Sequence, residues 1–97
     1  MAYESASFDS NLAIAAGNDH ALLAELRGAF RDSLLHHCDM LGRARCDANW
    51  LTAAQRIRGL GASFHSTELV AMADEAIEGA PGDPVVQRKL LAFALDL

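Results

Sequence analysis

Residues 54–69 give the clearest structural signal in the chain and read AQRIRGLGASFHSTEL. Within them, Ile57, Leu60 and Phe64 recur at intervals of three and four residues, the spacing of one apolar face of a helix. The same spacing reaches back to Trp50, so this segment is predicted to be an amphipathic helix. We expect the apolar seam of this helix to face a core and its opposite face to meet solvent.

The opposite face carries a glycine, Gly59, which is unusual inside a helix. Gln55 lies about 200° around the helix axis from Ile57, and Gly59 follows Gln55 by about one turn on the same side. A glycine inside a helix costs roughly 0.5–1 kcal/mol relative to alanine. Gly59 is therefore tolerated, or needed for the close approach of a neighbouring helix, or needed for a partner that docks on residue 55.

Helical spacing also runs through the rest of the chain, and no segment alternates as a strand does. Breaks and capping residues divide the chain into five predicted helices. The first is a short helix around Asp9–Ala16, and the second is a helix of about 26 residues after Gly17-Asn18-Asp19. A third helix is capped by Asp47, a fourth begins at Ser66 or Thr67, and the last is capped by Asp83-Pro84. Amphipathic helices joined by short loops pack as an antiparallel bundle. We therefore expect an all-α fold in a single domain that spans residues 1–97.

The composition is that of a compact protein, with 52% hydrophobic and 22% charged residues among 97. No apolar run approaches the roughly 20 residues of a membrane-spanning helix, so no membrane partner is expected. Residues 1–9 contain no Lys or Arg, so we expect no signal peptide. Cys38 and Cys46 are expected to stay reduced in the cytoplasm. The net charge of −5 argues against a nucleic-acid partner.

The charges are unevenly distributed along the chain. Four arginines lie around Gln55 in the sequence, namely Arg43, Arg45, Arg56 and Arg58. Five carboxylates then follow without an intervening Lys or Arg, namely Glu68, Asp74, Glu75, Glu78 and Asp83. These runs are either solvated helix faces or, in the case of the arginines, a basic patch that meets an acidic partner.

Residues 55–69 resemble the active helix of histidine-containing phosphotransfer (HPt) domains, the shuttle modules of bacterial phosphorelays. The pattern of that family is His-x-hydrophobic-Lys-Gly, then four or five mostly small residues, an apolar residue, a Gly, and a Leu four residues further on. This chain matches the pattern at Ile57, Arg58, Gly59, Phe64 and Leu69. Gln55 occupies the position of the phosphoacceptor His, and His65 occupies that of the second Gly. A carboxamide nitrogen cannot attack a phosphoryl group, because its lone pair is delocalised into the carbonyl.

The resemblance implies an antiparallel up-down four-helix bundle of HPt type, with a short extra helix at the N-terminus. It also implies a module that binds response-regulator receiver domains without accepting phosphate, and that acts as an adaptor, a decoy or an inhibitor. A hybrid histidine kinase is a second candidate partner. The implied docking face comprises Gln55, Arg56, Arg58, Gly59 and Ala62, with Arg58 at the position of the family's Lys. No catalytic residue, cofactor or metal ion is expected, and the protein is not expected to be an enzyme.

Two other functions are compatible with the sequence. The chain could be a helical interaction or dimerisation domain that has left the relay, with Trp50 or the Leu95–Leu97 end in the contact, and we expect a monomer or a weak dimer. It could also be an active phosphotransfer protein that uses another histidine. The candidates are His20, His36, His37 and His65, none of which lies at the acceptor position. A metal site made of His36, His37, Cys38 and Cys46 is disfavoured, because the two adjacent histidines point in different directions on a helix and no pair of these ligands is four residues apart.

Overall fold

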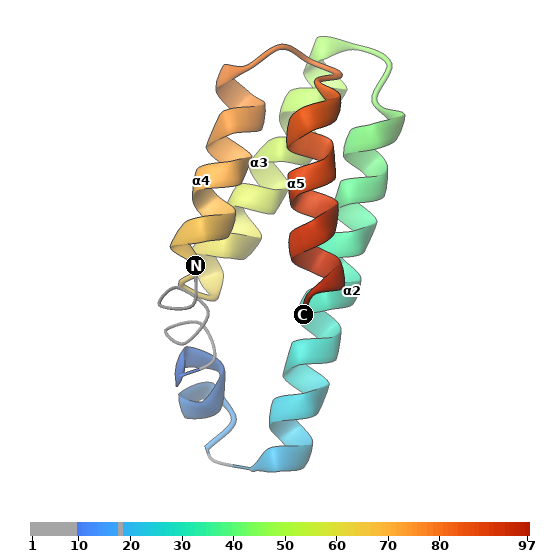
Figure 1. The fold of residues 1–97 in the computed structure, drawn as a ribbon. Coiled ribbons are helices and arrows are strands. Elements are labelled where there is room, and N and C mark those ends of the chain that lie inside the picture. The colour runs from blue at the N-terminus through green and yellow to red at the C-terminus, as the bar shows by residue number, and fades with distance from the viewer. Residues whose placement is uncertain (1–9, 18) are drawn as a thin grey trace.

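The computed structural model describes residues 10–17 and 19–97, and all regular secondary structure in that part of the chain is helical. It contains four long helices, which are α2 (His20–Arg43), α3 (Asp47–Ser63), α4 (Thr67–Glu78) and α5 (Pro84–Leu95) (Figure 1). Residues 10–15 form a further short helix, whereas the Asp9 end of the predicted one lies outside the described residues. The prediction of an all-α fold is confirmed. None of the described helices combines the length and the apolar character that a membrane crossing requires.

The starts of the helices follow from local capping chemistry. The side chains of Asp19, Ser66 and Asp83 each accept a hydrogen bond from a backbone N–H in the first turn of α2, α4 and α5. Such a cap contributes roughly 0.5–2 kcal/mol. The prediction that Asp47 caps the next helix is wrong by one residue. The backbone of Cys46 is extended, so Cys46 takes the cap position without a side-chain hydrogen bond, and Asp47 is the first residue of α3.

The helices α2 to α5 lie side by side, and each runs in the opposite direction to the one before it (Figure 1). α3 packs against α2 and α4, and α5 packs against the same two helices. α2 extends beyond the C-terminal end of α5, and the molecule is elongated, with extents of 42 × 22 × 19 Å. Because α3 has helices on its inner side only, its outer face is left open to solvent.

The core forms where the apolar faces of the helices meet. Its largest fully buried side chains are Leu12, Phe30, Leu34, Leu41, Ile57, Leu69 and Leu90. The rings of Phe30 and Phe64 meet edge to face, with 4.8 Å between their centroids. The seam predicted from the sequence is therefore the inner face of α3. Of its three central residues, Ile57 is fully buried, whereas Leu60 and Phe64 are half-buried.

Two features hold α3 close to α4. The indole N–H of Trp50 donates a hydrogen bond of 2.8 Å to the carbonyl oxygen of Ala76, and the Trp50 side chain is buried. A Cβ added at Gly61 would lie 3.1 Å from the backbone nitrogen of Val70, so α3 and α4 approach closely at this glycine. The interpretation of Trp50 as a contact between copies is therefore wrong, because its ring and its only donor are used inside the fold.

Candidate functional site

The residues of the predicted docking face all lie on α3 and are all exposed: Gln55, Arg56, Arg58, Gly59 and Ala62. Ile57, between them in sequence, is fully buried. Gln55, Gly59 and Ala62 follow one another at intervals of four and three residues, so they form one stripe along the helix. The two arginines lie on either side of this stripe. The exposed stripe of Gln55, Gly59 and Ala62 is thus bordered by two arginines.

Gly59 leaves open space in the middle of that stripe. A Cβ added there would meet no atom within 4 Å, in contrast to Gly61 two residues later. The hypothesis that a neighbouring helix needs Gly59 for a close approach is therefore excluded within the described residues. The hydroxyl of Ser63, one turn later, donates a hydrogen bond of 2.9 Å to the Gly59 carbonyl oxygen. Packing inside the fold does not account for a glycine at this position.

Arg58 is engaged within the fold. Its Nε donates a hydrogen bond of 2.8 Å to Oδ1 of Asp74, which projects from α4. Both side chains remain partly exposed, at 50% for Arg58 and 39% for Asp74, so the pair contributes only about 0.2–1 kcal/mol to stability. Arg58 and Asp74 are 16 residues apart in the sequence and lie on different helices, and their pairing was not predicted. A partner that docks on this face therefore has to compete with Asp74 for Arg58.

Arg56 points to the other side of the stripe, toward α2. The pKa of His37 is lowered mainly by burial, and further by the positive charges of His36 and Arg56. The rings of the two histidines are 5.4 Å apart and tilted. His36 and Arg56 are exposed, and His37 is half-buried. The relation of these histidines to the docking face depends on how α2 packs against α3, so the sequence did not predict it.

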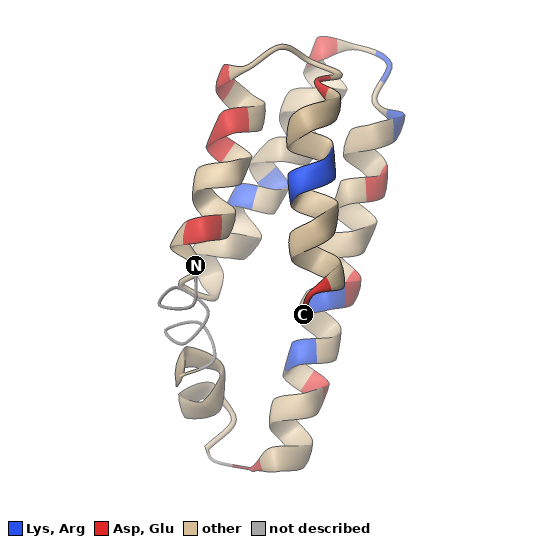
Figure 2. Ribbon diagram, viewed as in Figure 1, with Lys and Arg blue, Asp and Glu red and all other residues tan. Residues whose placement is uncertain are grey.

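The predicted basic patch is partly neutralised. Arg43 forms an ion pair of 3.1 Å with Asp39 on its own helix, in addition to the pair between Arg58 and Asp74. α3 packs against α4, along which Figure 2 shows several acidic residues, and one of these, Asp74, is the partner of Arg58. Two of the four arginines that surround Gln55 in the sequence thus have an intramolecular carboxylate as partner.

The turn after α3 places a residue other than glycine in a backbone conformation that favours glycine. His65 has a positive φ of 57°, in the left-handed region that favours glycine. The backbone N–H of Ser66 donates a hydrogen bond of 2.8 Å to the carbonyl of Gly61, which closes the end of the helix. A residue other than Gly, Asn or Asp in this region costs about 1–2 kcal/mol. His65 is exposed and stands beyond the C-terminal end of α3, away from Gln55.

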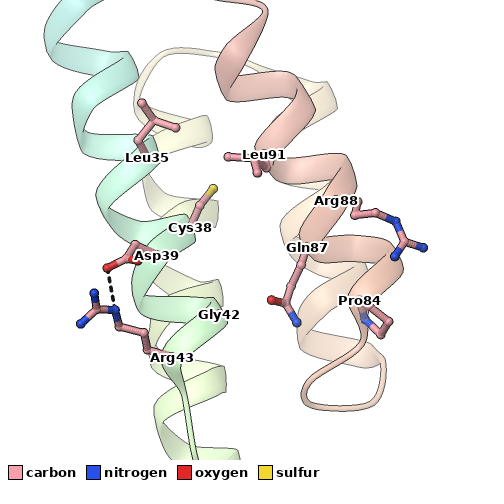
Figure 3. A pocket seen from close by; sticks show the side chains of 9 residues that line it. All are labelled: Leu35, Cys38, Asp39, Gly42, Arg43, Pro84, Gln87, Arg88 and Leu91. Atoms are coloured by element: carbon pink, nitrogen blue, oxygen red, sulfur yellow. Dashed lines mark ion pairs between the residues drawn. The ribbon is translucent and has the colours of Figure 1, made fainter.

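A groove with a volume of about 560 Å³ lies between α2 and α5, away from this face. Leu35, Cys38 and Leu91 give it an apolar floor, and the pair of Asp39 and Arg43 lies at its rim (Figure 3). Burial raises the pKa of the Cys38 thiol to about 11, so this sulfur is a poor nucleophile at neutral pH. Within the described residues, no three His, Cys, Asp or Glu side chains are arranged to hold a metal ion.

Comparisons with protein-family models, with curated proteins and with solved structures find no match for this chain. The observations that bear on function are therefore those on the outer face of α3 and on the side chains around it.

Proposed function

We propose that this protein is a pseudo-HPt module, an antiparallel up-down four-helix bundle of HPt type that binds receiver domains and cannot accept phosphate. The alternating helix directions and the resemblance of residues 55–69 to the active helix of that family support the fold assignment. The short extra helix of the proposal corresponds to residues 10–15. Such a module occupies the docking surface of a receiver and acts as an adaptor, a decoy or an inhibitor.

The observation that most supports the proposal is the free space over Gly59, one turn from the exposed Gln55. A glycine in a solvent-facing helix position reduces helix stability by roughly 0.5–1 kcal/mol without a packing benefit inside this fold. A partner that rests on the helix at this point explains the glycine, because any side chain would hold the partner away. The bordering arginines suit the acidic cluster of a receiver active site.

Binding of receiver domains encoded in the same genome, measured by titration calorimetry, tests this function. Gly59→Leu places a side chain in the free space and should weaken binding at least tenfold. Gly28→Leu is the matched control, because a Cβ at Gly28 of α2 also meets no atom within 4 Å and this residue lines a different surface. Both variants should remain folded.

Equal binding of the wild type and both glycine variants would place the contact elsewhere and favour a general helical interaction domain. Failure of every receiver domain to bind the wild type would overturn the proposal itself.

A further inference from the structure

The two sides of the proposed docking face differ in available charge. On the α4 side, Arg58 is already paired with Asp74. On the other side of the stripe, Arg56 projects from α3, which packs against α2, and its positive charge helps to lower the pKa of His37 of α2, whose ring centroid is 5.4 Å from that of His36. Within the described residues, no ion pair joins Arg56 or either histidine to a carboxylate. Three basic groups from two helices thus gather at one edge without a negative partner.

We propose that Arg56, His37 and His36 form a carboxylate-binding strip at the α2 edge of the docking face, and that this strip makes receiver binding proton-dependent. Arg58 contributes less to receiver binding than Arg56 does, because a carboxylate of the partner must compete with Asp74 for Arg58. The strip needs a partner seated on α3, so it rests on the function proposed above. Its ligand is an acidic protein surface, chosen because three basic groups are complementary to clustered carboxylates.

His37 provides the proton dependence because its environment in the free protein disfavours the charged form. Burial lowers its pKa below the usual 6.5, and repulsion from His36 and Arg56 lowers it further. The imidazole of His37 is therefore mostly neutral at pH 7. His37 is also half-buried, which limits the freedom of its ring.

Charges on the surrounding helices do not supply that carboxylate. Asp39 of α2 is paired with Arg43. On α5, which packs on the other side of α2, Lys89 is paired with Glu75 of α4, and Arg88 lines the groove between α2 and α5. A carboxylate on the partner would thus be the principal negative charge that acts on His37.

The direction of the pH effect follows from proton linkage. A partner carboxylate stabilises the imidazolium of His37, so its pKa is higher in the complex than in the free protein. The gain in affinity for the receiver that comes from a charged His37 is fully present at pH values below the pKa of His37 in the free protein. This gain is lost as the pH rises through the pKa of His37 in the complex. A rise of one unit corresponds to a factor of about ten, so binding should be about three to ten times tighter at pH 6 than at pH 8.

The test combines titrations with NMR. A receiver domain that binds the wild type is titrated at pH 6 and pH 8 against His37→Gln, His36→Gln, Arg56→Gln and Arg58→Gln. Arg58→Gln is the matched control for Arg56→Gln, because each removes one positive charge from one side of Gln55. The pKa of His37 is measured by NMR in the free protein and in the complex, which reports protonation rather than folding.

We expect His37→Gln to lose most of the difference between pH 6 and pH 8, and His36→Gln to lose part of it. Arg56→Gln should weaken binding at both pH values by a larger factor than Arg58→Gln. An unchanged pKa of His37 in the complex, or a larger effect of Arg58→Gln, would overturn the strip while leaving receiver docking intact. Absence of binding to any receiver would instead overturn the proposed function, and the strip with it.

Discussion

Two glycines of α3 should respond to alanine with opposite signs, although they are two residues apart. Gly59 has no atom within 4 Å of an added Cβ, so Gly59→Ala gains helix propensity without a clash. The expected gain in the free energy of unfolding is roughly 0.5–1 kcal/mol. For a domain of this size, 1 kcal/mol shifts the melting temperature by about 4–8 °C.

At Gly61 the added methyl would lie 3.1 Å from both the backbone nitrogen and Cγ2 of Val70, and 3.2 Å from Cβ of Leu69. A side-chain atom could rotate away, but a backbone atom moves only if α4 moves with it. Such overpacking costs about 1–3 kcal/mol, which exceeds the gain in helix propensity. Gly61→Ala should therefore lower the free energy of unfolding.

Urea denaturation followed by circular dichroism measures both changes against the wild type. The m-value should be the same in all three proteins, since the surface exposed on unfolding hardly changes. Destabilisation by Gly59→Ala would refute the reasoning, because it would mean that this glycine serves the fold and does not keep a surface clear. Stabilisation by Gly61→Ala would refute the close crossing of α3 and α4.

Two further predictions follow from the described contacts. Asp74→Asn should release Arg58 from its ion pair and tighten receiver binding by up to about fivefold. That factor corresponds to the 0.2–1 kcal/mol of an exposed ion pair. Unchanged or weaker binding in titration calorimetry would show that Arg58 does not face the partner. At pH 8, an alkylating reagent should modify the exposed Cys46 well before Cys38, whose pKa is raised to about 11 by burial. Faster modification of Cys38, measured by mass spectrometry, would contradict its placement between α2 and α5.

The sequence predicted those parts of the fold that depend on neighbouring residues. Asp19, Ser66 and Asp83 cap helices because a short polar side chain can reach the N–H groups two or three residues later. Cys46 lacks such a side chain, so the prediction placed the cap of α3 one residue late, at Asp47. Periodicity alone was sufficient to place Gln55 outside and Ile57 inside.

The charges of the site could not be predicted in the same way. The pairing of Arg58 with Asp74 depends on the register between α3 and α4, and a shift of one residue along either helix would separate the two groups by about 100° of rotation. The proximity of Arg56 to His37 likewise depends on how α2 crosses α3. Helix periodicity fixes the face on which a residue lies but does not fix its neighbour on another helix.

We propose that the protein has kept the docking face and lost the nucleophile, and Gln55→His tests this proposal most directly. Residue 55 is exposed beside the free space over Gly59, and an exposed imidazole with a pKa near 6.5 is largely neutral and nucleophilic at pH 7. Arg56 and Arg58 border the site and can stabilise the transferred phosphoryl group.

The measurement is the transfer of acid-labile, base-stable phosphoryl label from a phosphorylated receiver domain that binds the wild type. We predict label on residue 55 of the Gln55→His variant and none on the wild-type protein. Label on His20, His36, His37 or His65 of the wild type, or an unlabelled Gln55→His variant that still binds the receiver, would contradict the account.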